Sequence, residues 1–511
     1  MEFTGLLSAV VFLPLAGAVI IALVLRNYSH ARLFAAAVAV VDFILAIVAF
    51  AVYDTNAGGI QLIDRFSNWI PGLGDDGFAV QYLLGIDGLS APLVLLTGLL
   101  GLVAVLASWH IQLRVREYFI WLLALQTGVM GVFTSLDFLL FFLFWELELI
   151  PMFFLIAIWG SDPKSKREYS AMKFLIFTIL GSAFMLVGIL VLFFSTGTFD
   201  MTALPDAIRG ANLLLPAGVV FALLFVGFAV KLPLWPLHTW LPDAHTDAPT
   251  AGSVILAGVL LKMGGYGMFR VSVSMFPDVA QNAAWLFAAA GVINVIYGAI
   301  VVMRQTDLKR LIAFSSVSHM GFVMIGLASV VGVNGTVSTL GLTGAAMQMF
   351  THGTITGLLF LLVGMVYDKA HTRYIPDLGG LAKRMPFLAI ALLVAGLASL
   401  GLPGTSGFVA ELLIFLGAFK MWAIPTAIAA FGVVLAAAYI LWTIQRVMFG
   451  PIKDRFADIT DVSGIQYVPI ALLVIAIIAV GVFPSYISDV FSSGVEPIAN
   501  SLEQVAQARL R

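Results

Sequence analysis

The amino-acid sequence predicts an all-α membrane protein of about 14 transmembrane helices, two of them broken. Apolar residues make up 61% of the 511 positions and charged residues only 11%, whereas a soluble domain has about a quarter charged residues. Apolar runs that reach the roughly 20 residues needed to span a bilayer recur along the whole chain. So few charges cannot cover the surface of a soluble protein of this size, and we expect lipid to be its solvent.

The predicted spans occupy nearly the whole chain. They lie near residues 5–25, 31–53, 82–108, 116–135, 136–159, 171–195, 212–240, 249–270, 281–303, 310–332, 338–366, 387–420, 424–447 and 466–486. The seventh and twelfth are longer than the others and interrupted. The segment before the first span lacks the basic region of a cleaved signal peptide, so we expect that span to be retained. The longest loop is expected near residues 54–80, and no soluble domain fits between the spans.

The distribution of charge predicts the orientation in the membrane. When the loops are placed alternately on two sides, about 18 Arg and Lys residues lie on one side and about 6 on the other. The richer side is expected to be cytoplasmic, which places both termini on the periplasmic side of a bacterial inner membrane. A net charge near −2 gives no indication of nucleic acid binding, and the absence of cysteine excludes disulfides and iron–sulfur ligation on this chain.

Ionisable residues inside the apolar runs are the first functional signal. They are Glu146, Glu148, Lys231, Lys262 and Glu411. A charge at the bilayer centre costs roughly 2.5–3.5 kcal/mol, and such residues usually face the bundle interior and mark an ion or proton path. The alternative is a set of ion pairs that hold helices together, but buried pairs are weak sources of stability. Glu146 and Glu148 lie about 200° apart around a helix. Only one can face a given path, and periodicity does not say which.

Two histidines extend this set. His319 follows a serine-rich turn, and His352 shares a helix face with Gln348 and Thr356. Histidine titrates near neutral pH and can both accept and donate a proton. Each could instead be a hydrogen-bonded core residue, but the polar companions favour a hydrated stripe. We expect no metal site, because no His-x₃-His pair or carboxylate cluster lies nearby.

Two spans carry residues that break a helix. These are Pro233 and Pro236 in the seventh span, and Pro403 and Gly404 in the twelfth. Proline removes a backbone hydrogen bond, and unpaired backbone inside a membrane is tolerated only where protein buries it or where it lines a hydrated cavity. A packing kink would explain one break alone. Each break, however, has a buried charge close by, Lys231 in the first and Glu411 in the second.

The spacing of the breaks predicts an internal repeat. They lie five spans apart, and a repeat of five helices must invert its topology because five is odd. We therefore expect helices 1–3 over residues 1–115, inverted repeats over 116–270 and 271–450, and helix 14 with a tail over 451–511. Residue identity between the halves is slight, so the match is one of architecture.

Several motifs together carry a specific resemblance. They are Phe144-Trp145-Glu146 with residues 149–152, Lys231-Leu232-Pro233, residues 240–245 continuing into 248–253, Leu261-Lys262, residues 305–316 and residues 318–321. Over nearly its whole length the chain resembles the antiporter-like membrane subunits of respiratory complex I, most closely those of the chain M type. Glutamate at position 411 is typical of that type, whereas the sister chains L and N usually carry lysine there.

The resemblance implies a proton-translocating subunit of NADH:quinone oxidoreductase with no redox site on this chain. NADH, FMN, iron–sulfur clusters and quinone would be bound by other subunits, and chains L and N would be membrane partners. It implies Glu146 as the carboxylate paired with Lys231, Lys262 as the central relay, His319 and His352 beyond it, and Glu411 as the exit-side carrier. His238 and His245 are secondary candidates, and Glu148 receives no role.

Two other classes share these features. One is a subunit of a multisubunit cation/proton antiporter, and the other is a scaffold in a membrane hydrogenase-like complex. Composition does not separate them. Neighbouring genes for flavin and iron–sulfur subunits would favour complex I.

Overall fold

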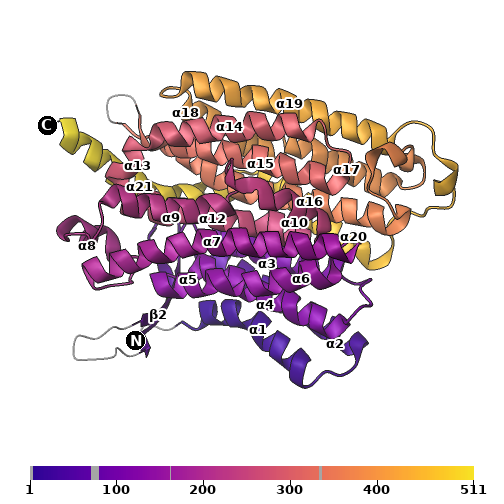
Figure 1. Ribbon diagram of the computed structural model, residues 1–511, viewed down its shortest axis with the longest axis horizontal. Helices are drawn as coiled ribbons and strands as arrows, with labels where there is room; N and C mark the ends of the chain where they lie inside the picture. The colour runs from indigo at the N-terminus through magenta and orange to yellow at the C-terminus, as the bar shows by residue number, and fades with distance from the viewer. Residues whose placement is uncertain (1–3, 71–79, 162, 333–335, 511) are drawn as a thin grey trace.

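The computed structural model describes residues 4–70, 80–161, 163–332 and 336–510. Its helices run side by side along one direction, with both termini at one end of the bundle (Figure 1). We call this end the terminal face. The opposite end, where α4 (Val115–Thr134) and α7 (Lys164–Thr196) begin, is called the basic face because its loops carry most of the Arg and Lys residues.

Helices account for most of the described chain. In the first half they are α1 (Leu6–Leu23), α2 (Tyr28–Val52), α3 (Ala91–Ala107), α5 (Phe138–Leu147), α6 (Leu149–Trp159), α8 (Leu204–Gly210), α9 (Ala217–Lys231), η1 (Leu237–Thr239), α10 (Trp240–Asp247), α11 (Thr250–Ile255), η2 (Leu256–Leu260), α12 (Leu261–Gly267) and η3 (Met268–Val273). In the second half they are α13 (Pro277–Asn282), α14 (Ala284–Val302), α15 (Leu308–Leu327), α16 (Thr339–Ala370), α17 (Pro386–Ser399), α18 (Ser406–Ala418), α19 (Ala423–Met448), α20 (Tyr467–Val482) and α21 (Ser485–Leu510). Short 3₁₀ turns connect several of them.

The helices match the predicted fold class. Within the described residues, 11 helical segments are long and apolar enough to cross a membrane by length and composition. Shorter apolar helices fill the third, seventh and twelfth predicted spans, the twelfth as the two halves α17 and α18. Both predicted breaks are present, since α9 ends at Lys231 and α17 ends at Ser399. The eighth span stays helical but includes two π-helical stretches, η2 and η3, on either side of α12.

One region differs from the all-α prediction. Residues expected to form a loop include strand β1 (Gln61–Ile70), which pairs antiparallel with β2 (Val80–Ile86). The third span therefore begins at Ala91, not near residue 82. Hydropathy misses this boundary because the strand and the helix are both apolar. The transition is made at Asp87, whose carboxylate accepts hydrogen bonds from the backbone N–H groups of Leu89 and Ser90.

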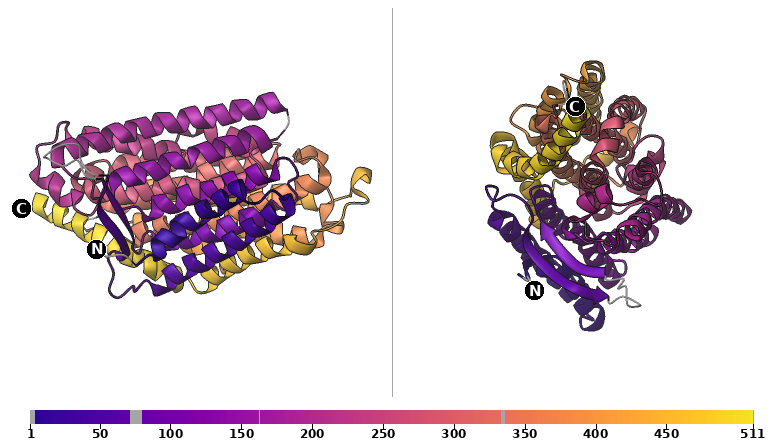
Figure 2. Two further views of the ribbon diagram at one scale, coloured as in Figure 1. Left: turned by 90° about the horizontal axis from the view of Figure 1, so that it is seen from below. Right: turned by 90° about the vertical axis from the view of Figure 1, so that its left-hand side faces the viewer.

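The segment after the last span also differs from the prediction. Instead of a tail, residues 485–510 form the helix α21, which lies across the terminal face and packs on α3, α13 and α16 (Figure 2). One side of α21 is apolar and buried, with Phe491, Val495 and Leu502 fully covered. Gly494 lies against the start of α3 so closely that a Cβ there would sit 2.2 Å from the Leu89 nitrogen. The last helix is therefore packed directly on the first part of the chain.

The hairpin also holds the beginning of α1. The buried Asp64 carboxylate of β1 accepts hydrogen bonds from Thr4 Oγ1 (3.0 Å), the Gly5 N–H (2.7 Å), and the N–H and hydroxyl of Ser8 (2.9 and 2.7 Å). Burial alone would raise the pKa of Asp64, but the hydrogen bonds from Ser8, Gly5 and Thr4 together hold that pKa below its ordinary value. The ionised carboxylate thus satisfies N–H groups that the first turn of α1 cannot pair internally.

We expect Asp64→Asn to loosen the start of α1. An amide oxygen is a weaker acceptor than a carboxylate, and hydrogen bonds to charged groups contribute about 1.5–3 kcal/mol each. Hydrogen exchange at the amides of Gly5 and Ser8 should become faster, while Asp54→Asn, a control on the same segment, should leave these rates unchanged. Because the folded-state pKa is lowered, the difference from wild type should be full above about pH 4. It should shrink as the pH falls through the pKa of folded Asp64. Equal exchange rates at neutral pH would contradict this role.

Candidate functional site

The break in the seventh span places Lys231 inside the bundle. Pro233 and Pro236 interrupt the helix directly after Lys231, and α10 then continues from Trp240. Asn294 of α14 holds the interruption, because its Oδ1 accepts from the Trp235 N–H (2.8 Å) and its Nδ2 donates to the Pro233 carbonyl (3.1 Å). Two backbone groups of the interrupted segment are thus satisfied by one side chain.

The carboxylate bound to Lys231 is Glu148, not Glu146, so the expected pairing was wrong. The ammonium group donates a hydrogen bond to Glu148 Oε1, and both side chains are buried. The rings of Trp145 and Phe174 lie 5.4 and 5.8 Å from the ammonium nitrogen, within the range of a cation–π interaction. Lys231 is therefore enclosed by one carboxylate and two aromatic faces.

The local backbone explains the choice of partner. The fifth span turns at Glu148, where α5 ends and α6 begins. Gly128 of α4 admits this turn, since a Cβ there would lie 3.0 Å from the backbone nitrogen of Glu148. Glu146, two residues earlier, is only partly buried and lies beside Ser182 of α7, with Lys231 still within electrostatic reach. Glu148 therefore contacts the lysine directly, whereas Glu146 interacts with it only electrostatically.

A second group of predicted residues forms a continuous buried row. Lys262 Nζ lies 2.8 Å from His352 Nδ1. The rings of His352 and His319 have centroids 5.6 Å apart, and His319 Nδ1 lies 3.7 Å from Glu411 Oε1. All four side chains are almost fully buried. Each can gain and lose a proton, so the row is a chain of proton acceptors that leads from the eighth span to the twelfth.

The second break positions the end of this row. Gly401 has a φ of +74°, and a Cβ there would lie 2.5 Å from Glu411 Oε2. A side chain at this position would therefore collide with the carboxylate and strain the backbone. Ser399, the last residue of α17, lies 3.2 Å from His319 Nε2 through its hydroxyl. The break thus makes room for Glu411 and gives His319 a second polar partner.

The structure does not bring every candidate into contact. Among the described residues, no hydrogen bond joins Lys231 to Lys262. His238 packs against the rings of Tyr297 and Phe314, 5.1 and 6.3 Å away. His245 is stacked on Phe360 at 4.5 Å. No group of three or more His, Asp or Glu side chains that could hold a metal ion occurs in the described part of the chain.

Asn294, Glu148 and Asp42 are three of the buried polar residues outside the sequence-based site. Asn294 and Glu148 are described above. Asp42 of α2 is fully buried and accepts a hydrogen bond from Gln126 of α4 (2.6 Å). Glu148 was found by the rule that identified the lysines, namely a polar residue within an apolar span, but received no role, and Asp42 could have been found in the same way. Asn294 was missed because it carries no charge.

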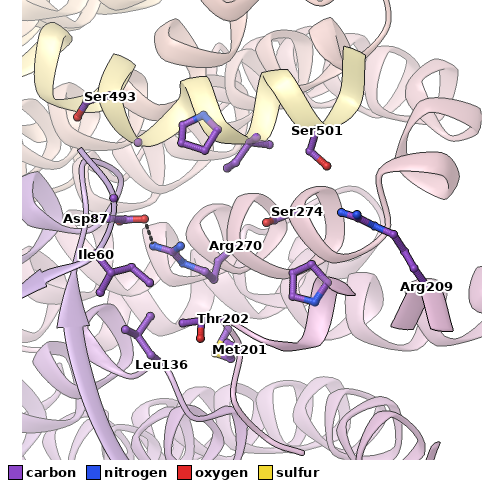
Figure 3. Close-up of a pocket in the computed structure, with 15 residues that line it drawn as sticks. Ile60, Asp87, Leu136, Met201, Thr202, Arg209, Arg270, Ser274, Ser493 and Ser501 are labelled. Carbon is purple, nitrogen blue, oxygen red and sulfur yellow. Dashed lines mark hydrogen bonds and ion pairs between the residues drawn. The ribbon is translucent and has the colours of Figure 1, made fainter. Parts of the chain in front are cut away.

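A cavity of about 370 Å³ lies apart from the row, on the terminal face (Figure 3). Its wall includes the ion pair between Arg270 of η3 and Asp87, with 2.5 Å between nitrogen and oxygen. Arg270 Nε also donates to Tyr266 Oη at 3.2 Å. Ser274, Ser493 and other hydroxyl-bearing side chains surround the pair. This cavity joins the hairpin to α21 and contains no member of the buried row.

Comparisons with known proteins identify the fold. Residues 135–437 match the family described as NADH:quinone oxidoreductase/Mrp antiporter, transmembrane. NADH-quinone oxidoreductase subunit M of Rhodobacter capsulatus is 41% identical over 507 residues, which cover 96% of each chain. A chain of respiratory complex I from Thermus thermophilus superimposes with a TM-score of 0.84 at 29% identity, covering 98% of this chain and 99% of that one. A chain of the Mrp complex of a Dietzia species has a TM-score of 0.82 at 20% identity, covering 99% of each chain, and shows the shared fold.

The fold and the buried row define an antiporter-like, multi-pass membrane subunit. The chain belongs to the NADH:quinone oxidoreductase/Mrp antiporter family. Its curated relatives include proteins named subunit M of NADH-quinone oxidoreductase.

We expect Asn294→Ala to destabilise the first break. It would leave the Trp235 N–H and the buried Pro233 carbonyl without their partner, and an unsatisfied buried group costs about 1–3 kcal/mol. The matched control is Ile296→Ala, which removes a partly buried apolar side chain from the same helix. Thermal unfolding of the purified assembly should show a larger loss for Asn294→Ala than for the control. Equal losses would mean that the amide does not support the break.

Proposed function

We propose that this chain translocates protons as the chain-M-type subunit of a proton-pumping NADH:quinone oxidoreductase. The observation that carries the proposal is the row from Lys262 through His352 and His319 to Glu411, in which titratable groups follow one another inside a membrane-spanning bundle. Quinone reduction elsewhere in the complex would drive the movement. Electron transfer would use NADH, FMN, iron–sulfur clusters and quinone on other subunits.

The proposed coupling element is Lys231 with its two carboxylates. Glu148 binds the ammonium directly, and Glu146 is within electrostatic reach. Either carboxylate, when ionised and close, favours the charged lysine. When this attraction is withdrawn, burial favours the neutral amine, so the lysine releases its proton. Lys262 is the next titratable group in the predicted order, and Glu411 at the second break is the exit-side carrier.

The assignment also predicts the orientation in the membrane, the neighbouring subunits and the internal repeats. The basic face would be cytoplasmic and the terminal face periplasmic in a bacterial inner membrane, as the bias of Arg and Lys residues favours. Sister chains L and N would be neighbours in the membrane. The segments 116–270 and 271–450 would be the two inverted repeats, flanked by helices 1–3 (1–115) and the last helices (451–511). Purification of the native complex tests the assignment, since a complex that cannot oxidise NADH would favour a cation/proton antiporter or a hydrogenase-like assembly.

We predict that Glu148→Gln impairs both assembly and pumping. Removing one partner of a buried ion pair leaves an uncompensated charge, which costs about 3–5 kcal/mol. The double variant Glu148→Gln/Lys231→Met removes both charges and should recover assembly, because an apolar replacement of a buried pair is often neutral or stabilising. NADH-driven proton uptake by membrane vesicles should nevertheless stay low. Restored uptake in the double variant would show that the pair is structural.

The comparison of Glu146→Gln with Glu148→Gln, at matched assembly, tests the two-carboxylate arrangement. Glu146→Gln should lower proton uptake while leaving assembly intact, because Glu146 is only partly buried and does not hold Lys231 in place. Unchanged uptake would remove Glu146 from the path.

The prediction for Glu411 separates carriage of a proton from support of the second break. Glu411→Gln keeps the size and hydrogen bonding of the side chain but cannot ionise, so it should lose most activity. Glu411→Lys restores a titratable group and should recover part of it. If Glu411 only supported the break near Gly401, glutamine would be tolerated and lysine would fail, since a second positive group would be buried in the row that already contains Lys262. Proton uptake in vesicles at matched assembly decides between the two orders.

A further inference from the structure

A cavity of about 410 Å³ at the basic face has no part in the proposed proton path. It lies where the connection between α3 and α4, the second half of α6 and the first turn of α7 meet. Its volume falls in the range of about 300–1,000 Å³ that is typical of ligand pockets. Its wall contains no member of the buried row, so the cavity needs an explanation of its own.

The polar part of the wall is basic. The described residues there include three cations, Arg114, Lys164 and Arg167, and one anion, Glu168. Glu168 Oε1 lies 3.5 Å from Lys164 Nζ, one turn away on α7. Two positive charges therefore remain in excess among the described residues that line the cavity. This excess favours an anionic ligand.

The Arg167 side chain is held in place by the end of α6. Its Nε donates to the Ala157 carbonyl and its Nη1 to the Gly160 carbonyl, each at 3.1 Å. The last carbonyl groups of a helix have no partner within the helix, and they attract cations. The guanidinium group therefore keeps its positive charge at a fixed place. Arg114 and Lys164 are exposed, so both long side chains can turn toward a ligand.

The apolar part of the wall continues toward the middle of the membrane. Phe154 and Ile158 of α6 line the cavity, and Ile150, four residues before Phe154, is 52% exposed. Residues four apart lie on the same face of a helix. These three side chains therefore form an apolar stripe that is about 12 Å long at 1.5 Å per residue. The stripe leads away from the basic groups at the end of α6.

We propose that this cavity binds one anionic phospholipid from the leaflet at the basic face. The phosphate group contacts the three basic side chains, and an acyl chain lies along the apolar stripe of α6. A soluble anion would use the basic part of the wall only, whereas a phospholipid matches both parts. Basic pockets between transmembrane helices on the cytoplasmic side are suited to anionic headgroups. The inference goes beyond the proposed function and does not depend on it.

Protection of a single thiol tests the site in the purified native complex. The chain contains no cysteine, so Ala157→Cys places one thiol in the wall of the cavity. After the lipids have been removed in detergent, a maleimide should label this thiol, and mass spectrometry of the modified peptide distinguishes it from thiols of other subunits. Phosphatidylglycerol should slow the labelling. Phosphatidylcholine with the same acyl chains, and inorganic phosphate at the same concentration, should not.

Paired substitutions separate this site from a general attraction of lipid to the basic face. Arg114→Gln/Lys164→Gln removes two cations from the wall. Each Lys or Arg near an anionic lipid contributes about fivefold in affinity, so the phosphatidylglycerol concentration that gives half protection should rise roughly 25-fold. Arg26→Gln/Lys383→Gln removes the same charge from exposed positions outside this cavity and should change nothing. Arg114→Lys/Lys164→Arg keeps both charges and should retain the protection.

The site is overturned if phosphatidylcholine protects the thiol as well as phosphatidylglycerol does, or if protection survives in Arg114→Gln/Lys164→Gln. Protection by inorganic phosphate would show a site for soluble anions and not for a lipid. A thiol that stays unreactive in the lipid-free complex would show that another subunit covers the cavity. The comparison of lipids on Ala157→Cys alone decides the matter if the charge variants do not assemble. No step needs NADH or a proton gradient, so a negative result leaves the proposed function untouched.

Discussion

The charge of Lys231 is compensated where no bulk water can solvate it, and much of the surrounding architecture depends on that compensation. Helix α9 stops at this lysine, the fifth span turns at Glu148 to meet it, and aromatic rings close the remaining sides. Glu148 can reach it because Gly128 leaves room for the turn. Desolvation of both charges consumes much of the Coulomb attraction. The arrangement therefore determines where a charge can lie inside the bundle. It adds little to the free energy of unfolding.

The break beside Lys231 illustrates the same constraint for the backbone. Proline removes hydrogen bonds that a bilayer cannot replace, so another protein group has to supply them. At the first break, the side chain of Asn294 pairs two backbone groups of the interrupted segment. At the second break, Gly401 adopts a backbone conformation that leaves space for Glu411. An amide side chain thus supports the first break and a glycine conformation shapes the second. Each break lies beside a titratable residue.

Sequence reasoning predicted the fold class, both breaks and the residues that form the buried row. Each of these features can be recognised from the type of residue found within a long apolar run. A polar residue in a long apolar run is conspicuous, and so is a proline in a helix. The partner of Lys231 could not be predicted, because two glutamates on one short segment differ only in direction, and that direction is set by a turn packed on another helix. Helix α21 was missed because only one of its sides is apolar, and the hairpin was missed for a different reason. Hydropathy measures how apolar a segment is, and strand β2 is as apolar as the helix that follows it.

The contact between Gly494 of α21 and the residues before α3 has a consequence for synthesis of the chain. Tyr53 and Ser493, whose hydroxyl oxygens are 3.4 Å apart, are separated by 440 residues. The ribosome delivers the N-terminal helices first, and domains form in that order during translation. The contacts of the first three helices with α21 can therefore form only after Ser493 and Gly494 have been added. The terminal face is complete only then. A chain truncated before α21 therefore lacks the helix that packs on its N-terminal part.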